Sequence, residues 1–340
     1  MTRTTRLVIL LAAVVLLGAV GTGSVLYAAH RSGIKDQQQA DGPTVRAGTV
    51  SLRPTAQRRL LVRNLAWGPH RDEIATVPAD DPRGPRTVSG VKCLRFHAAA
   101  GTGICLQSVH GPLEDTYRAV VLDTHLHKRH SFPAAGIPTR ARVSPSGHMA
   151  AWTVFVSGDS YAGTNFSTRT AIVDTRTWAV DDNLETFRVV KGGRSYHAAD
   201  TNVWGVTFAD DNRFYATLAT GGQTYLVRGD VTARTLTTLH RNVECPSLSP
   251  DGTRIAYKKR VKGASPDAPW RLYVLNLRTM KETVTAESRN IDDQALWSDD
   301  STLVYALPGD YGSDLWTVPA DGTGTARRLM TSALAPAYLG

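Results

Sequence analysis

A strand-turn-strand pattern recurs along most of the chain, and this repeat constrains the fold more than any other feature. Its clearest copy is ECPSLSPDGTRIAYKK, residues 244–259. Apolar and β-favouring residues flank Ser249-Pro250-Asp251-Gly252, where proline presets one φ angle, aspartate can bond its own backbone and glycine accepts a positive φ. The segment is therefore expected to form a β-hairpin. A single hairpin is marginally stable in water, so neighbouring copies are expected to bury one another.

The copies align on a large apolar residue just before the turn. Successive copies are separated by 29, 47, 65, 40 and 49 residues, and the aligned positions are Trp67, Phe96, Val143, Phe208, Leu248 and Trp297. A second pair of strands is predicted after several hairpins, at 119–124, 171–177, 272–279 and 315–323. A period of about 40 to 50 residues with four short strands is typical of propeller blades.

The two ends of the repeat region are expected to close a ring. Residues 45–62 contain two predicted strands, GTVSL and RRLLV, which resemble the outer half of a blade. Leu334-Ala335-Pro336 begins a truncated seventh copy, and the segment LAPAYL that it opens could pair with them, as chain ends do in closed propellers. We therefore predict six blades within residues 45–340, with seven blades as the alternative.

These repeats resemble those of a known family. SPDGTRIAY, SPSGHMAAW and the following LYVLNLRT-type strand are similar to the repeats of TolB-like six-bladed β-propellers, over roughly residues 45–340. The copies at Phe96 and Trp297 lack the Pro-Asp-Gly turn. The whole chain also resembles actinobacterial membrane-anchored or exported TolB-like translocation proteins. The resemblance implies an all-β fold, a six-bladed propeller preceded by one transmembrane helix, and it implies no defined activity.

The amino-terminal region is expected to contain a membrane-spanning helix. Residues 7–29 carry no charge, and a helix of 23 residues at about 1.5 Å per residue spans the roughly 30 Å hydrocarbon layer. Arg3 and Arg6 precede it, which favours a cytoplasmic tail at 1–6 and an extracytoplasmic propeller, although His30, Arg31 and Lys35 weaken that bias. Residues 30–44 are predicted to form a polar linker. Cleavage as a signal peptide, followed by secretion, is the alternative, and the long apolar run disfavours it.

Charge leaves several classes of partner open. The net charge is +9, from 39 Lys and Arg against 30 Asp and Glu. Nucleic acid, anionic lipid and anionic wall polymer are all compatible with such a balance, and so is a diffusely basic surface, which we favour. No Arg-rich helix, aromatic RNA-binding signature or zinc-finger spacing accompanies the charge. We therefore expect no nucleic-acid partner, a membrane contact through the helix, and a monomer.

The cysteines and histidines do not predict a metal or cofactor. Cys93 and Cys105 lie on the two strands of one predicted hairpin, and the sequence does not decide whether they form a disulfide or remain two thiols. Cys245 is expected to be a free, buried thiol. There is no Cys-x-x-Cys or His-x-x-x-His spacing for zinc. His125 and His127 alternate along a segment predicted as an outer strand or its exit turn, where a solvated polar edge is favoured over a metal site. Five Asp-Asp pairs are interpreted as turn caps rather than calcium ligands.

The starts of the inner strands are expected to surround one mouth of the central channel with polar residues. This predicted rim and its adjoining loop, 157–169, supply the candidate binding residues. They are Arg63, Asn64, Lys92, Arg140, Arg142, Asn202, Trp204, Glu244, Asp292 and Asp293 on the strands, and Tyr161, Asn165 and Phe166 in the loop. A second long insertion, 185–205, and a shorter loop, 308–314, are further candidates. Alanine at Arg140, Trp204 and Glu244 is expected to abolish partner binding without lowering the melting temperature.

Two functions follow from this rim. The favoured one is a non-catalytic extracytoplasmic scaffold that binds an envelope protein, peptide or polymer. The alternative is a propeller hydrolase or lyase acting on an envelope carbohydrate or lactone, with Glu244 and Asp292 or Asp293 as its carboxylate pair. The chain has no Gly-x-Ser-x-Gly elbow. His148, Ser195, His197 and Asp200 include the residue types of a catalytic triad but not its spacing, so no catalytic residue is assigned.

Overall fold

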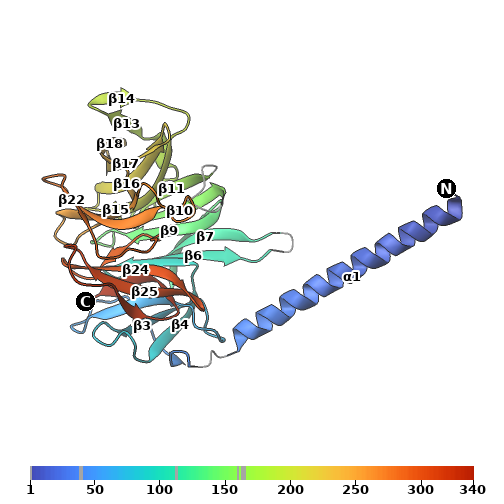
Figure 1. Cartoon of the computed structure of the whole chain (residues 1–340). Coiled ribbons are helices and arrows are strands. Elements are labelled where there is room, and N and C mark those ends of the chain that lie inside the picture. The colour runs from blue at the N-terminus through green and yellow to red at the C-terminus, as the bar shows by residue number, and fades with distance from the viewer. Residues whose placement is uncertain (1, 38–40, 112–113, 159–160, 162–165) are drawn as a thin grey trace.

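The protein is a six-bladed β-propeller preceded by one long helix (Figure 1). The computed structural model describes residues 2–37, 41–111, 114–158, 161 and 166–340. Six sheets surround a common axis, and the first strands of neighbouring blades contact one another, which places these strands nearest the axis. The predicted fold and blade number are confirmed.

Five blades are built from consecutive antiparallel strands that run from the axis outward. The prediction of four short strands for each blade is confirmed in blades 2, 3, 5 and 6, and blade 4 has two strands in addition. Their strands are, in blade 2, β5 (Arg95–Ala99), β6 (Thr102–Val109), β7 (Thr116–Leu122) and β8 (Lys128–Pro133); in blade 3, β9 (Ile137–Val143), β10 (Met149–Ser157), β11 (Ser167–Asp174) and β12 (Val180–Asp181); in blade 4, β15 (Asn202–Phe208), β16 (Arg213–Thr220), β17 (Gln223–Asp230) and β18 (Thr235–Arg241); in blade 5, β19 (Glu244–Leu248), β20 (Arg254–Arg260), β21 (Trp270–Asn276) and β22 (Glu282–Val284); and in blade 6, β23 (Leu296–Trp297), β24 (Thr302–Gly309), β25 (Gly312–Pro319) and β26 (Arg327–Met330).

Blade 1 joins the two ends of the propeller. Its innermost strand is the carboxyl-terminal β27 (Ala333–Leu339), and the next three are β2 (Arg59–Asn64), β3 (Glu73–Pro78) and β4 (Arg86–Lys92). β2 and β27 pair antiparallel, with Leu60 opposite Tyr338, so the predicted closure is confirmed. The hairpin whose turn contains Trp67 therefore consists of the second and third strands of a blade and does not include the innermost one.

The outer edge of blade 1 differs from the sequence prediction. The added strand is β1 (Val45–Ala47), which pairs parallel with β4. The predicted strand GTVSL, residues 48–52, does not form a strand. Gly48 donates its amide to the carbonyl of Val88 in β4, and Leu52 donates its amide to the carbonyl of Thr124 in blade 2. The buried side chains of Val50 and Leu52 pack against blade 2, which explains why this segment has an apolar pattern without forming a strand.

A buried arginine stabilises the ring closure through hydrogen bonds. Arg86, at the start of β4, donates Nη1 to Asn64 Oδ1 at 2.7 Å and to the carbonyl of Ser332 at 2.8 Å. Its Nη2 donates to the carbonyl of Thr331. Burial lowers the pKa of Arg86 to about 10, partly opposed by the charge of Asp314. The guanidinium therefore satisfies polar groups at the point where β27 begins.

Both additional insertions are ordered as hairpins in the described residues. The insertion at 185–205 forms the 3-10 turn η1 (Leu184–Thr186) and the strands β13 (Arg188–Lys191) and β14 (Arg194–Tyr196). β13 pairs parallel with β18, so blade 4 has six strands and the insertion extends its outer edge rather than forming a free recognition loop. The segment 308–314 is the tight turn between β24 and β25, with Gly309 opposite Gly312.

The core lies between adjacent blades. For example, Leu272 and Val274 of blade 5 form one buried cluster with Leu303 and Tyr305 of blade 6. Alternate residues of each strand face the neighbouring sheet, and burying a Leu or Val side chain contributes about 1.5–3 kcal/mol. Each blade is thus stabilised by the next.

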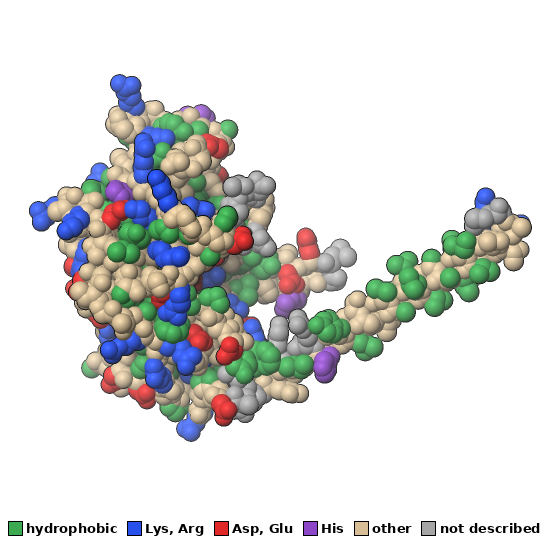
Figure 2. Space-filling view, in the orientation of Figure 1, with side chains coloured by type: hydrophobic (Ala, Val, Ile, Leu, Met, Phe, Trp, Pro, Cys, Tyr) green, Lys and Arg blue, Asp and Glu red, His purple; other side chains and the backbone are tan. Residues whose placement is uncertain are grey.

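The helix α1 (Arg3–Asp36) projects from the propeller as an isolated rod (Figures 1 and 2). Residues Arg3–His30 have a mean hydropathy of 2.4 and bury none of that surface within the protein, so the helix is long and apolar enough to span a membrane. Figure 2 shows hydrophobic side chains along most of its length. The helix continues to Asp36, so the first half of the predicted polar linker, 30–44, is helical.

Cys93 and Cys105 form a disulfide, with their Cα atoms 5.4 Å apart. Cys105 lies opposite Phe96 on β6, and Cys93 precedes β5, so the bond joins the entry of blade 2 to its second strand. Cys245 is a free, buried thiol.

We expect Arg86→Leu to destabilise the propeller by about 2 kcal/mol, because it leaves buried acceptors at the ring closure without their donor. Urea unfolding followed by circular dichroism measures the change. The matched control is Arg83→Leu, which removes an exposed arginine from the same turn that also donates to carbonyls of blade 6, at Arg328 and Leu329. The control should change stability by less than about 0.5 kcal/mol. Equal effects of the two variants would contradict the role of Arg86.

Candidate functional site

The central channel is filled by residues 292–295, which precede β23 and which we call the axial segment. Its side chains reach four other blades. Asp292 Oδ1 accepts a hydrogen bond from Lys258 Nζ of blade 5 at 2.9 Å. Asp293 pairs with Arg95 of blade 2 and with Arg140 of blade 3, each at 3.3 Å. Gln294 donates to carbonyls of blades 4 and 5. Since β23 is only two residues long, the axial segment is free to cross the axis instead of continuing the strand.

The charges around the axial segment hold its carboxylates in the ionised form. Burial alone would raise the pKa of Asp293, but Arg95 and Arg140 outweigh it and lower that pKa below its usual value. Burial likewise opposes ionisation of Asp292, whose pKa is nevertheless lowered by Lys258 and Arg140. Both side chains are therefore anions at neutral pH, and they anchor three cationic side chains from different blades.

A cavity of about 680 Å³ opens at the end of the channel where the inner strands begin, and we call it the mouth cavity. Its apolar wall includes Ile137, Phe155 and Leu334. Its charged groups are of both signs, and they are Arg95, Arg140, Arg289, Asp292 and Asp293. Arg289 makes two hydrogen bonds to the carboxylate of the buried Glu287 and lies 3.8 Å over the ring of Trp316, so its position is fixed.

Tyr161, from the insertion at 157–169, lines this cavity. Its hydroxyl and that of Thr139 are hydrogen-bonded at 2.9 Å, and its carbonyl accepts from Arg260 Nη2 at 2.7 Å. The charged groups of Arg140 and Lys258 lie 4.9 and 5.0 Å from the centre of its ring. Such cation–π contacts are worth more when they are desolvated, and Tyr161 is buried. The ring therefore offsets part of the cost of burying two cations.

The structure brings together some of the predicted rim residues. Arg140, Asp292, Asp293 and Tyr161 all line the mouth cavity. Phe166 lies next to it, with its ring edge-on to Trp204 at 5.3 Å. Asn165 lies outside the described residues.

The other predicted residues have different surroundings. Lys92 is exposed at the end of β4, and Asn202 accepts hydrogen bonds from Thr168 of blade 3. Trp204 and Glu244 are fully buried, and Glu244 pairs with Arg260 at 2.7 Å. Arg142 lies deeper in the channel and lines its opposite end. Arg63 and Asn64 belong to the second strand of blade 1, where Arg63 pairs with Asp72. Alanine at Arg140, Trp204 and Glu244 would therefore lower stability, contrary to the sequence-based expectation, because all three are buried.

Three charged residues of the site were not singled out from the sequence as binding residues. Arg95 follows Lys92 at the start of an inner strand, so the same argument could have found it. Lys258 lies in the second strand of blade 5 and is 1% exposed. A lysine in the run RIAYKKR is expected to face solvent, so the pattern carried no signal for it. Arg289 lies in a segment without regular structure before β23.

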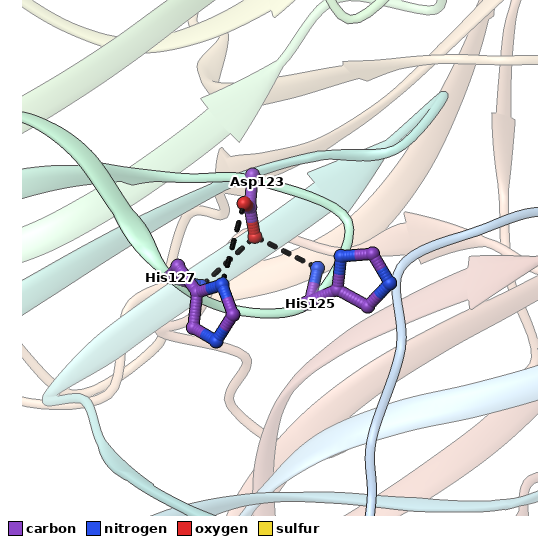
Figure 3. Close-up of side chains that lie close together, drawn as sticks. All are labelled: Asp123, His125 and His127. Atoms are coloured by element: carbon purple, nitrogen blue, oxygen red, sulfur yellow. Dashed lines mark hydrogen bonds and ion pairs between the residues drawn. The ribbon is translucent and has the colours of Figure 1, made fainter.

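Asp123, His125 and His127 are the described residues that could together hold a metal ion (Figure 3). They lie in the turn between β7 and β8, and their ligand atoms are within 4.8 Å of one another. Asp123 Oδ1 accepts the amides of His125 and His127 at 2.8 and 2.9 Å, and burial of Leu126 between the two histidines turns both rings outward. Capping of the turn explains the position of the carboxylate. The histidines lie in the exit turn of β7, one of the two positions expected from the sequence.

The residues with triad chemistry have separate partners. His148 pairs with Asp211 at 2.9 Å, and Asp200 accepts from the hydroxyl of Thr220 at 2.7 Å. Ser195 lies in β14 at the outer edge of blade 4. These contacts link blades 3 and 4 and close the insertion hairpin, and they do not build a nucleophile with a base.

Comparisons with known proteins agree with this fold. No protein-family model matches the chain, and no curated protein matches its sequence. TolB from Acinetobacter baumannii aligns with a TM-score of 0.50 and 17% identity over 83% of this chain and 66% of TolB. A puromycin-hydrolyzing peptidase from Mycobacterium tuberculosis aligns with a TM-score of 0.50 and 12% identity over 83% of this chain and 44% of the peptidase. A chain of the nidogen/laminin complex aligns with a TM-score of 0.52 and 8% identity over 84% of this chain and 99% of that one.

These similarities concern the fold alone, because similar folds carry unrelated functions. By fold, the chain is a six-bladed β-propeller of the type found in TolB, as the sequence resemblance implies. It spans less than two thirds of the length of TolB and less than half of the peptidase.

We expect Asp293→Asn to lower the melting temperature at pH 7 by about 3–6 °C, because Arg140 would lose the carboxylate that compensates its buried charge. A carboxyl with a lowered folded pKa contributes stability above its unfolded pKa, and this contribution is lost as the pH falls through the folded value. The wild-type protein should therefore lose more stability between pH 5 and pH 2 than the variant does. Melting curves across this range test the expectation, with the exposed Asp267→Asn as control. Parallel curves for Asp293→Asn and wild type would contradict it.

Proposed function

We propose that this chain is a non-catalytic binding propeller of the cell envelope, whose mouth cavity receives part of a protein, peptide or polymer partner. The observation that carries the proposal is the mouth cavity itself, which combines about 680 Å³ of space with an apolar wall and charged groups of both signs. Concave sites with apolar walls and a few convergent polar groups are typical of ligand-binding sites.

The mixed charge favours a peptide segment over a uniformly charged polymer. Arg95 and Arg140 lie at one side of the cavity, where they could bind a carboxylate in addition to Asp293. Asp292 has a side chain that is 54% exposed, so it retains acceptor capacity toward amide or ammonium donors. A peptide supplies both kinds of group within a short length.

The contacts of the carboxylates argue against the alternative, a hydrolase or lyase for an envelope carbohydrate or lactone. A glycosidase needs one carboxyl with a raised pKa as its general acid. The pKa values of Asp292 and Asp293 are instead lowered by Lys258, Arg95 and Arg140. Glu244, the third candidate, is fully buried against Arg260. These groups serve better as fixed anions than as proton donors.

The helix and the sequence resemblance support a location at the membrane. α1 is long and apolar enough to anchor the propeller in a membrane, and Arg3 and Arg6 at its start favour a cytoplasmic amino terminus. The propeller would then face the extracytoplasmic side, where the Cys93–Cys105 disulfide is stable. Secretion after cleavage of the helix is the alternative.

Protease added to intact cells should digest the propeller, and a band of full length in the membrane fraction should show the uncleaved anchor. Protection of the propeller would place it in the cytoplasm.

A photocrosslinking amino acid at Ile137 should capture the partner in living cells. Ile137 lines the mouth cavity and is 47% exposed, so its replacement costs little stability. The matched control is Val284, which is 51% exposed on β22, the outermost strand of blade 5. We expect a defined adduct from position 137, identified by mass spectrometry, and none from position 284.

The variant Ile137→Asp should weaken binding of the identified partner at least about tenfold, because it places an unpaired carboxylate on an apolar wall. Val284→Asp should leave binding unchanged, and both variants should melt close to the wild-type temperature. Equal adducts at the two positions, or full binding by Ile137→Asp, would exclude the mouth cavity. Turnover of glycoside or lactone substrates that is lost in Arg95→Ala would favour the enzyme instead.

A further inference from the structure

A second cavity, of about 590 Å³, opens at the opposite end of the channel. β9 connects the two ends, since Ile137 at its start lines the mouth cavity and Val143 at its end lines the second one. We call the second one the distal cavity. The axial segment lies between them, and Arg142 donates to the carbonyl of Ala295 in that segment at 3.1 Å. The distal cavity is therefore a separate site rather than a continuation of the mouth.

The charged side chains that line the distal cavity are cationic. They are Arg142, Arg213 and Arg228, and no Asp or Glu lines it among the described residues. Arg213 is exposed and pairs with Asp210 at 2.7 Å. Arg142 and Arg228 have no ion pair within 4.0 Å in the part of the chain that the structure describes. The cavity therefore carries two cations without a carboxylate partner.

Aspartates do occur on this face, but they are engaged in turns outside the cavity. Asp211 accepts hydrogen bonds from Ser144 and Ser146 and pairs with His148. Asp251 accepts from Ser249 and Thr253 in the Ser-Pro-Asp-Gly turn. These groups stabilise the hairpin ends, and they leave the interior of the cavity positive.

Arg142 is the clearest case of a cation in this cavity that lacks a carboxylate partner. It is 8% exposed, donates to one backbone carbonyl, and its Nε has no acceptor among the described groups. Burial lowers its pKa to about 10, although Asp293 partly opposes this. Arg140, two residues earlier and 7% exposed, has Asp293 within 3.3 Å. A buried cation without a paired anion is unfavourable, so we expect Arg142 to lower the stability of the unliganded propeller.

His97 also lines the distal cavity. Its Nδ1 accepts the amide of Val143 at 3.1 Å, and burial together with the charge of Arg142 holds its pKa well below the usual value. The neutral ring therefore carries its proton on Nε2. Trp297, Tyr215 and Tyr338 supply aromatic surface, and a volume of about 590 Å³ lies in the usual range for a small-molecule site.

We propose that the distal cavity binds a small organic anion, a carboxylate or phosphate carried on a sugar-sized body, with Arg142 and Arg228 as its cationic contacts. The anion compensates the buried guanidinium of Arg142, and the aromatic side chains pack against the body of the ligand. Binding here uses none of the residues assigned to the mouth cavity, so the inference does not depend on the proposed function.

Isothermal titration of the full chain in detergent tests the site, with glucose 6-phosphate and glucuronate as anionic probes and glucose as the neutral one. We expect at least one anionic sugar to bind with a Kd below about 1 mM at low salt, to bind less tightly at higher salt, and glucose not to bind. Binding of glucose 6-phosphate alone would identify phosphate as the preferred anionic group, and binding of glucuronate alone would identify carboxylate. No binding of either one would overturn the proposal. Inorganic phosphate binding as tightly as glucose 6-phosphate would overturn the sugar-sized body.

Two variants assign the binding to this cavity. Arg142→Met should weaken binding at least about tenfold while leaving the melting temperature equal or higher, because it removes an uncompensated buried charge. Arg228→Gln changes an exposed residue and should weaken binding about three- to tenfold with no change in melting. The matched control is Arg194→Gln, an exposed arginine on β14 that does not line the cavity, and it should bind like wild type. Should Arg142→Met fail to fold, Arg228→Gln decides alone, and wild-type binding by that variant would overturn the assignment.

Discussion

The pairing of β27 with β2 is the interaction on which the rest of the structure depends. A propeller blade covers only its two neighbours, so an open array would expose the faces of its first and last blades and the edge of β2. Because β27 completes blade 1, every blade in the ring has a neighbour on both sides. Arg86 adds a specific fastening there, since its guanidinium satisfies acceptors from both chain ends at once.

A closed ring leaves a central channel, and the axial segment shows how that space is used. Four cationic side chains point toward the axis from three blades, while the axial segment supplies two carboxylates, Asp292 and Asp293. These carboxylates pair with Arg95, Arg140 and Lys258. Arg142 has no carboxylate partner within 4.0 Å among the described residues. This unequal distribution divides the channel into a mouth of mixed charge and a distal cavity that is positive, and it gives the two ends different chemistry.

Much of the architecture could be predicted from the sequence, because turn chemistry and strand alternation are local signals. The hairpin at Leu248, the strands at 119–124 and 272–279, and the closing role of LAPAYL are all present in the structure. The prediction that GTVSL forms a strand was wrong, because an extended segment packed on a neighbouring blade has the same apolar pattern. The site was predicted only in part. Arg140 and Asp292 were placed correctly at the mouth, but burial of Trp204 and Glu244 depends on contacts between blades far apart in sequence, and the lysine at 258 is buried against the rule for its residue type.

The position of β27 also dictates the order in which the molecule can be completed. Its partner β2 is synthesised more than 250 residues earlier, so the last contact of the ring is also one of the most distant in sequence. Loop closure over such a span slows folding, and the nascent chain carries an unpaired strand edge until β27 has been synthesised. Ring closure therefore has to wait for the synthesis of β27, and β2 lacks its inner partner until then.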